Sequence, residues 1–420
     1  MGQLRTAICS ALAPLLFAGP TLAQAITDPT APAPAPSPPS KPAPDAPPSP
    51  FSFTGDYTAD VLSDAAGGEA RGVRYLDLVK LSAAYDGAAS GHDGLTGLVS
   101  IEHHNGARFS GELVGDSQVV SNLEGPPEAI RLYEFWLQKE VGGGRGGVKA
   151  GFIDLNTTFD VQETAALFLN SSDGIGADLA DTGQNGPSVS PTTALAATAF
   201  YRPAEGWTTQ LGVFDGVAGD PQHRRRFVAV ELSARDGALI IGQVEKRFGD
   251  AARLEAGAWT YTADFAALDG PTPPTPAKLI GGNAGIYGLA EGKLLSKPDA
   301  DEAGLSGWIR LGLANGRIDR VANYLGGGLV YTGLVPGRDR DEVGIALMRA
   351  GFGGPARLAA ERNGVRMGGA ETTFEAAYRY AFRDWLNIQP DVQYVIHPGG
   401  DLALGNALVV GLRLAFTASR

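Results

Sequence analysis

Few side chains in this sequence are suited to covalent chemistry or metal binding. His103 and His104 are adjacent, so a strand would send their side chains to opposite faces, where they cannot share a metal ion. Ser100 and His104 would share one strand face, which is compatible with part of a hydrolase triad. The chain contains no Gly-x-Ser-x-Gly motif, the turn that presents the serine nucleophile in many hydrolases.

A second catalytic hypothesis is a glycosidase, which needs two carboxylates at a defined separation. Glu102 and Glu134 are residues of the right type, but their positions in the sequence do not fix the distance between them. We therefore expect no enzyme, no bound metal and no cofactor. Glu102 and Glu134 are better explained as polar residues of alternating β-strands.

These β-strands are segments in which apolar and polar residues alternate. In residues 374–382 aromatic and small residues occupy every second position, with Glu375 and Arg379 between them. A period of two places side chains on opposite faces of a sheet. In a transmembrane barrel one face meets lipid and the other faces a wet lumen. Two further strands show the same pattern, with outward sets Leu386, Ile388, Pro390, Val392, Tyr394, Ile396 and Leu408, Val410, Leu412, Leu414, Phe416.

Earlier segments alternate as well. In Leu132–Glu140 the pattern places Tyr133, Phe135 and Leu137 on the lipid side and Glu134 and Trp136 on the other. Transmembrane strands need about 9–11 residues, so the chain after residue 51 can hold an even number of about 14 to 18 strands. The turn-rich stretches Asn170–Pro191 and Leu268–Gly285 would be outer loops or segments folded into the pore.

The N-terminus predicts export from the cytoplasm. Arg5, the apolar run Ala7–Phe17 and the small-x-small sequence Ala23-Gln24-Ala25 are typical of a secretory signal peptide. The single cysteine, Cys9, lies within it, so the mature chain would have no disulfide, zinc-thiolate site or cysteine nucleophile. We expect a signal peptide at 1–25, a flexible Pro/Ala-rich periplasmic segment at 26–52 and the barrel at 53–420.

The overall composition agrees with a membrane barrel. Only 19% of the residues are charged, and the formal net charge is −12. Soluble domains carry about 25% charged residues. Nucleic-acid binding is disfavoured because no basic stripe is available to neutralise phosphates. A net negative lumen would favour the passage of small cations over anions.

Four blocks of sequence resemble a known family, the OprB carbohydrate-selective porins of Gram-negative outer membranes. Arg338 and Asp339 close the third block, which begins at Gly327. The similarity extends over most of residues 53–416. The blocks are residues 131–136 with 151–156 and 159–160, residues 166–176 with 185–188, residues 327–339, and residues 371–382 with 385–400.

The resemblance implies a sixteen-stranded antiparallel barrel in the outer membrane through which sugars diffuse without being altered. Its partners would be sugar solutes, outer-membrane lipids and the barrel-assembly machinery, and a homo-oligomer is compatible with it. The chain departs from the usual pattern because Phe416 is followed by four more residues instead of ending the sequence. Two other hypotheses remain open, a general non-selective porin and a secreted β-rich adhesin that binds carbohydrate.

A sugar pore needs charged and amide groups to replace the hydrogen bonds of water, and an aromatic surface for the sugar ring. Binding must also stay weak, because a tightly held solute blocks conduction. Glu134 and Trp136 fit this requirement if both face the lumen, although tryptophan is also common at membrane interfaces. The full set of predicted pore or sugar-contact residues is Arg131, Glu134, Trp136, Asp154, Arg338, Asp339, Arg379, Asp391, Gln393 and Arg413.

Overall fold

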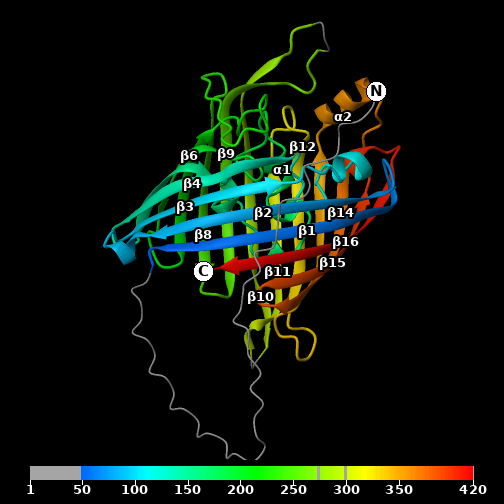
Figure 1. Cartoon of the computed structure of the whole chain (residues 1–420). Coiled ribbons are helices and arrows are strands. Elements are labelled where there is room, and N and C mark those ends of the chain that lie inside the picture. The colour runs from blue at the N-terminus through cyan, green and yellow to red at the C-terminus, as the bar shows by residue number, and fades with distance from the viewer. Residues whose placement is uncertain (1–48, 272–274, 298–299, 420) are drawn as a thin grey trace, which may run out of the picture. The chain divides into compact units, whose positions relative to one another are not determined.

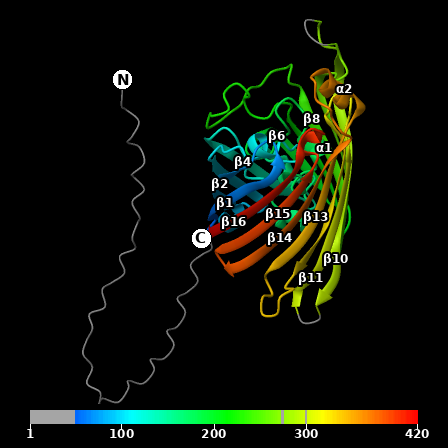
Figure 2. The ribbon, with the colours of Figure 1, turned by 90° about the vertical axis from the view of Figure 1, so that its right-hand side faces the viewer.

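The computed structural model describes residues 49–271, 275–297 and 300–419. The predicted signal peptide and nearly all of the predicted Pro-rich segment lie outside these residues. In the described part, sixteen strands form one closed antiparallel barrel (Figures 1 and 2). The strands are β1 (Phe51–Gly68), β2 (Gly72–Asp86), β3 (Leu95–His104), β4 (Ala129–Val141), β5 (Gly146–Ile153), β6 (Ala194–Tyr201), β7 (Trp207–Asp215), β8 (Ala238–Phe248), β9 (Ala252–Ala266), β10 (Leu279–Lys297), β11 (Ala300–Leu313), β12 (Val321–Thr332), β13 (Glu342–Phe352), β14 (Ala370–Arg383), β15 (Leu386–Ile396) and β16 (Gly405–Ser419).

Helices in the described residues are short and lie in the connections between strands. None of them is long and apolar enough to cross a membrane. They are the α-helices α1 (Ala177–Ala180) and α2 (Gly354–Arg362), the π-helix η2 (Ser110–Val114), and the 3₁₀ helices η1 (Gly87–Ser90), η3 (Leu155–Thr157), η4 (Thr164–Leu167), η5 (Ser171–Asp173) and η6 (Pro398–Gly400).

The barrel closes where the first strand meets the last. β1 pairs with β2 on one side and with β16 on the other, in a register that includes Asp60↔Arg413. Every other strand pairs with its two neighbours in sequence. Closure leaves no edge strand with unpaired backbone groups, which is what a sheet needs in order to span hydrocarbon. The predicted barrel with sixteen strands is confirmed.

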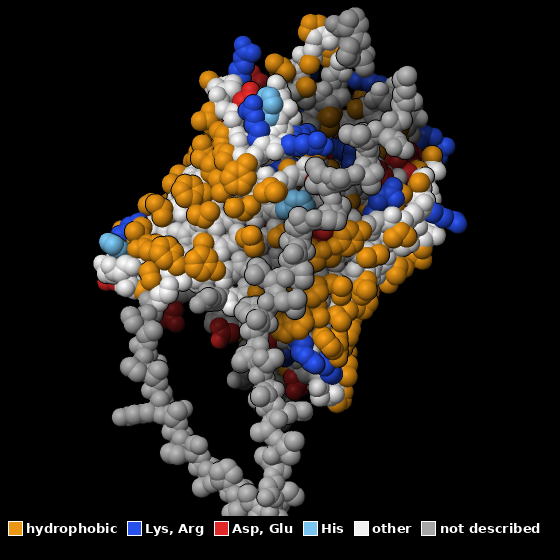
Figure 3. Space-filling view, viewed as in Figure 1, with side chains coloured by type: hydrophobic (Ala, Val, Ile, Leu, Met, Phe, Trp, Pro, Cys, Tyr) orange, Lys and Arg blue, Asp and Glu red, His pale blue; other side chains and the backbone are white. Residues whose placement is uncertain are grey.

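The outer wall carries the apolar face of the alternating strands. Phe374, Val392 and Leu412 are 46%, 44% and 42% exposed, whereas their neighbours Glu375 and Gln393 are buried inside. Hydrophobic side chains cover much of this wall, and Lys and Arg gather mainly towards the long loops at the top of the view (Figure 3). An apolar surface this extensive is unfavourable in water and marks the contact with lipid.

A β-bulge corrects one expectation about β4. Ser100 of β3 pairs with Glu134, but the next residue, Ile101, pairs with Leu132, so Tyr133 has no residue opposite it. The extra residue bends the strand and turns the Tyr133 side chain inward, where it is buried and donates a hydrogen bond to Asp154. The prediction that Tyr133 faces lipid is therefore wrong, because simple alternation fails at a bulge.

Two long connections fold into the barrel, and we call them the first inner loop (residues 105–128) and the second inner loop (residues 154–193). Hydrogen bonds join both loops to distant parts of the wall, for example Ser121 to Asp60 and Leu169 to Glu375. The predicted turn-rich stretch Asn170–Pro191 belongs to the second inner loop. Leu268–Gly285 is only partly a connection, because β10 begins at Leu279 and its glycines lie within a strand that has a bulge.

Candidate functional site in the barrel lumen

The second inner loop is held against the wall by a buried arginine. Arg310 of β11 is fully buried, and its Nε and Nη2 donate to the two carboxylate oxygens of Asp160 at 3.0 and 2.8 Å. Its Nη1 pairs with Asp178 of α1, and the rings of Tyr287 and Tyr324 lie 5.4 and 5.2 Å from the guanidinium. One cation from the wall thus joins two points of the loop.

Gly176 allows the loop to approach this arginine. Its N–H donates to Asp160 at 3.2 Å, and a Cβ at this position would lie 2.1 Å from the guanidinium carbon of Arg310. Any larger residue would displace the guanidinium or the loop and disturb the ion pair. The glycine is therefore required by the close packing of loop and wall.

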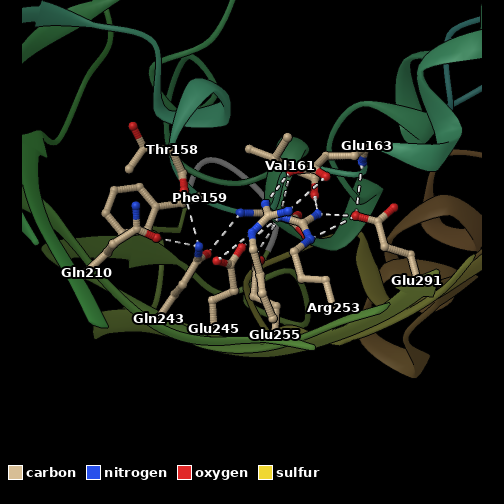
Figure 4. A network of polar contacts seen from close by, with 12 residues as sticks. Thr158, Phe159, Val161, Glu163, Gln210, Gln243, Glu245, Arg253, Glu255 and Glu291 are labelled. Carbon is tan, nitrogen blue, oxygen red and sulfur yellow. Dashed lines mark hydrogen bonds and ion pairs between the residues drawn. The ribbon is translucent and has the colours of Figure 1, made fainter. Parts of the chain in front are cut away.

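A second charged network, around Arg253, also contacts the second inner loop (Figure 4). Arg253 of β9 donates to Glu291 through Nε at 2.9 Å and to Glu245 through Nη1 at 3.1 Å, and it also contacts the carbonyl of Val161 in the loop. Glu291 in turn accepts the N–H of Thr164 at 2.7 Å. The side chains of β8, β9 and β10 therefore hold residues 161–164 of the second inner loop.

The last strands hold residues 167–170 of the loop through hydrogen bonds. Glu375 accepts the N–H groups of Leu169 and Asn170 at 2.6 and 3.2 Å. The side chain of Gln389 donates to the carbonyl of Leu167 at 2.6 Å, and Asn170 donates to Gln393 at 3.2 Å. The loop is thus fastened to wall strands on more than one side of the lumen.

The first inner loop is fastened in a similar way. Glu371 of β14 accepts the N–H groups of Ser117 and Gln118 at 2.7 and 2.9 Å, and that of Gly399 at 2.6 Å. Ser121 donates to Asp60 of β1 at 2.6 Å. These buried contacts use the carboxylates that alternation places on the inner face.

Other inward side chains remain partly exposed to the lumen. Arg413 pairs with Asp60 at 2.7 Å and donates to Asn122 at 2.8 Å, with 12% of its side chain accessible. Arg379 pairs with Glu342 and has 30% of its side chain accessible. Asp391, beside them on β15, is buried and accepts from Gln393 at 3.2 Å. Arg379, Asp391, Gln393 and Arg413 therefore all face inward, as parity predicted.

Glu134 and Trp136 also lie on the inner face and contact each other. The indole N–H of Trp136 donates to Glu134 at 3.2 Å, and the ammonium of Lys149 lies 4.9 Å from the indole ring. Glu134 also accepts the N–H of Asp154 at 3.3 Å. The result is an aromatic surface flanked by a cation and an anion on β4 and β5.

The remaining predicted residues lie elsewhere. Arg131 is buried near the loop end of β4 and donates to the carbonyl of Arg224 at 3.1 Å. Arg338 and Asp339 lie in the turn between β12 and β13, where Arg338 pairs with Asp341 at 2.9 Å. Asp339 is exposed in that turn. The structure therefore does not bring these three residues together with the lumen cluster around Trp136.

Sequence reasoning missed the residues that anchor the second inner loop. Residues 308–313 alternate, with Arg310 opposite Ile309 and Leu311, but the pattern contains no sign of the partners of Arg310, which lie 150 and 132 positions away. Arg253 lies in a segment that we did not identify as a strand. The sequence did contain one signal for these anchors. Each is a basic residue within a strand, and a charge that becomes buried there needs an acidic partner.

Burial changes the acidity of carboxyl groups in the second inner loop. Burial raises the pKa of Asp154 to about 6, although the hydroxyl of Tyr133 donates to it and opposes the shift. Burial also raises the pKa of Asp160, against the lowering effect of Arg310. The pKa of Asp173 rises well above its ordinary range because of burial and then repulsion from Asp391.

The alternatives based on catalysis find little geometric support. Ser100 accepts the N–H of Glu134 at 3.2 Å, while His104 contacts Glu102 at 3.3 Å and the carbonyl of Leu123 at 3.2 Å. His103 lies on the opposite face and contacts Glu128. Within the described residues no group of three or more histidine, cysteine or acidic side chains is arranged to hold a metal ion.

A comparison with protein families decides the identity of this barrel. The model of the family described as "Carbohydrate-selective porin, OprB family" matches residues 70–417. The chain belongs to the OprB family. It is 24% identical over 350 residues to Porin B of Pseudomonas aeruginosa, a match that covers 75% of each chain.

Solved structures show the same fold. The high-pH structure of Pseudomonas putida OprB superposes with a TM-score of 0.78 at 21% identity, covering 88% of this chain and 94% of that one. The low-pH structure of the same protein gives a TM-score of 0.54 at 17% identity, with coverage of 88% and 92%. The outer membrane channel DcaP of Acinetobacter baumannii gives a TM-score of 0.55 at 8% identity, with coverage of 88% and 97%. This OprB-family protein is a carbohydrate-selective channel of the Gram-negative outer membrane.

Proposed function

We propose that the channel lets glucose and similar mono- and disaccharides diffuse passively down their concentration gradients. The observation that carries this proposal is the second inner loop, which is fixed inside the barrel by Arg310, Arg253 and Glu375. A loop fixed to the wall at these points would narrow the lumen. A narrowed pore with polar walls can discriminate between solutes by size and hydrogen bonding.

The residues beside the loop suit a neutral sugar. Lys149, Arg379 and Arg413 offer charged donors for hydroxyl groups, and Trp136, whose indole N–H is held by the buried Glu134, offers an aromatic face for the ring. Most of these charges are already paired with protein groups. A passing sugar would exchange weak contacts with them instead of being trapped, as conduction requires.

The proposal includes no chemical step on the solute and no cofactor. The outer-membrane lipids would contact the apolar wall, and the barrel-assembly machinery would insert it. A homo-oligomer would bury part of that wall between copies. Each of these points extends the family assignment and needs its own test.

The direct test is swelling of liposomes that contain the purified, detergent-folded protein. Glucose should enter faster than neutral solutes of similar size, because the lumen offers matched hydrogen-bond partners and an aromatic surface. Equal rates would identify a general non-selective porin. No swelling by protein shown to be inserted would refute the channel and favour a carbohydrate-binding adhesin.

A further inference from the structure

A polar pocket of about 270 Å³ lies among the connections at the loop end of the barrel. It is lined by the first inner loop, the second inner loop and the connection of residues 216–237, with Arg131 of β4 also contributing. It is separate from the lumen cluster of Trp136 and Lys149. Sites for drug-sized ligands measure about 300–1,000 Å³, so this pocket is the right size for one sugar ring.

The cationic groups of the pocket have spare hydrogen-bonding capacity. Arg131 is 5% exposed, and it donates only to the carbonyls of Pro127 and Arg224, while its Nη1 is buried without a hydrogen-bond partner in the described residues. Glu102 lies opposite Arg131 in the register of β3 and β4 and attracts its charge, but its oxygens contact Lys80 at 3.8 Å, His104 and Ser190, and it forms no direct ion pair with Arg131. A buried N–H group without an acceptor is costly, so a bound anion that accepts from Nη1 would stabilise this site.

Arg224 is a second cation in the lining of the pocket, and its one side-chain hydrogen bond is weak. Its Nη2 makes a single long contact of 3.4 Å to the amide oxygen of Asn185, and the side chain is otherwise exposed. Arg224 also supplies the carbonyl to which Arg131 donates. The two arginines are therefore neighbours in one pocket, and neither forms an ion pair within the described residues.

The acidic groups of the pocket are already engaged. Asp220 accepts from the N–H and the ring of His223 at 3.0 and 2.8 Å and from Arg226 at 3.1 Å. Glu124 accepts the N–H groups of Phe109 and Ser110 at 3.0 and 2.8 Å. The free capacity of the pocket is thus cationic, although the protein as a whole is acidic.

The remaining lining suits the body of a sugar. The rings of Pro126, Pro187 and Pro191 and the side chain of Val189 present apolar surface, and Thr192 brings a hydroxyl group. A pyranose ring has C–H groups on its faces and hydroxyls on its edge. Apolar surface beside polar groups is therefore complementary to it.

From these observations we propose that the pocket captures a monosaccharide that carries a carboxylate, which Arg131 and Arg224 would bind. This inference rests on the proposed sugar channel and adds an entry site for sugar acids. The site would concentrate an anionic sugar at the mouth of a channel whose net charge disfavours it.

The test measures equilibrium binding of glucuronate and glucose to the full detergent-folded chain by titration calorimetry. Glucuronate should bind at least about tenfold more tightly than glucose, because a charge-assisted hydrogen bond is stronger than a neutral one. Arg224→Ala should weaken glucuronate binding about tenfold. Arg225→Ala is the matched control, since it removes an adjacent exposed charge that does not line the pocket.

A pair of steric variants keeps the test independent of charge. Ala229→Trp should abolish glucuronate binding by filling the pocket, whereas Val228→Trp, at an exposed position next to the lining, should leave it unchanged. Equal effects of Arg224→Ala and Arg225→Ala, or equal affinity for glucuronate and glucose, would overturn the proposal. Because calorimetry needs no permeation, failure here is distinguishable from failure of liposome swelling.

Discussion

Individual lumen residues fall into two groups according to whether their hydrogen bonds are complete. Arg310 is fully buried and paired, so it serves structure. Arg379 and Arg413 are paired on one side and accessible on the other. Groups of the second kind can exchange contacts with a passing solute because their desolvation is incomplete.

At the residue scale, we predict that Trp136→Ala weakens the block of ion current by glucose about three- to tenfold. An aromatic contact contributes about 0.5–1.5 kcal/mol, and its loss leaves Glu134 and Lys149 in place. Single-channel recordings with added glucose measure the effect. Trp385→Ala, which removes an exposed tryptophan from the turn between β14 and β15, should leave the block unchanged. Unchanged block in Trp136→Ala would remove this residue from the sugar path.

The inward direction of Glu134, Trp136, Arg379 and Arg413 could be predicted from alternation alone. The partner of each residue could not, because loops bring the partners from far along the chain. Tyr133 shows a further limit of the method. One extra residue in β4 reverses the side-chain direction, and the sequence does not reveal which residue of the strand is the extra one.

At the scale of elements, the second inner loop depends on buried charges supplied by the wall. We predict that Arg310→Met loosens this loop, because Asp160 and Asp178 would remain buried without a cation. Breaking a buried ion pair costs about 3–5 kcal/mol. Hydrogen exchange of residues 154–193 should therefore accelerate, and open-channel current should become noisier.

The triple variant Arg310→Met, Asp160→Asn, Asp178→Asn is the control for this prediction. It removes the unpaired carboxylate charges of Asp160 and Asp178 together with the arginine, so the loop should recover much of its protection against hydrogen exchange. Fast exchange in the triple variant would show that the hydrogen-bond geometry matters more than the charge. Unchanged exchange in Arg310→Met would contradict the anchoring role.

The same loop should respond to pH through Asp173. Both of its carboxylate oxygens are buried without hydrogen-bond partners in the described residues, and its folded pKa is raised well above 3.8 by burial and by Asp391. The docked loop therefore holds more protons than the released loop, and docking weakens as pH rises from about 4 towards the raised pKa. Hydrogen exchange of residues 154–193 should accelerate over this range.

Asp173→Asn removes the titrating group at nearly constant size. This variant should flatten the part of the pH dependence that Asp173 contributes, while Asp160 remains paired with Arg310. The prediction is contradicted if hydrogen exchange of the wild-type loop slows as the pH is raised, after correction for intrinsic exchange rates.

The inner loops also mark how far elements could be predicted. Asn170–Pro191 was recognisable as turn-rich, and its position outside or inside the barrel was left open by composition. The acceptors that draw it inward, such as Glu375 and Gln393, are ordinary inward residues of their strands. The first inner loop, residues 105–128, gave no comparable signal.

At the scale of the whole molecule, the net charge of −12 predicts a channel that prefers cations. In a bilayer with a salt gradient, the reversal potential should favour the cation, and the preference should decline at high ionic strength because of screening. A reversal potential that favours the anion would show that arginines such as Arg379 and Arg413 dominate the narrow part.

The barrel itself could be predicted from the sequence, because three successive strands alternate between apolar and polar residues and each would present a wholly apolar face to lipid.

The seam between β1 and β16 makes closure of the barrel depend on both ends of the described chain. The partner of the first strand is the last segment of the chain, so the wall cannot close until residues 405–419 are present. A chain lacking them would expose two rows of unpaired amides to hydrocarbon, at several kcal/mol for each group. Loss of the final strand should therefore prevent a stable barrel in the bilayer even though the fifteen other strands are intact.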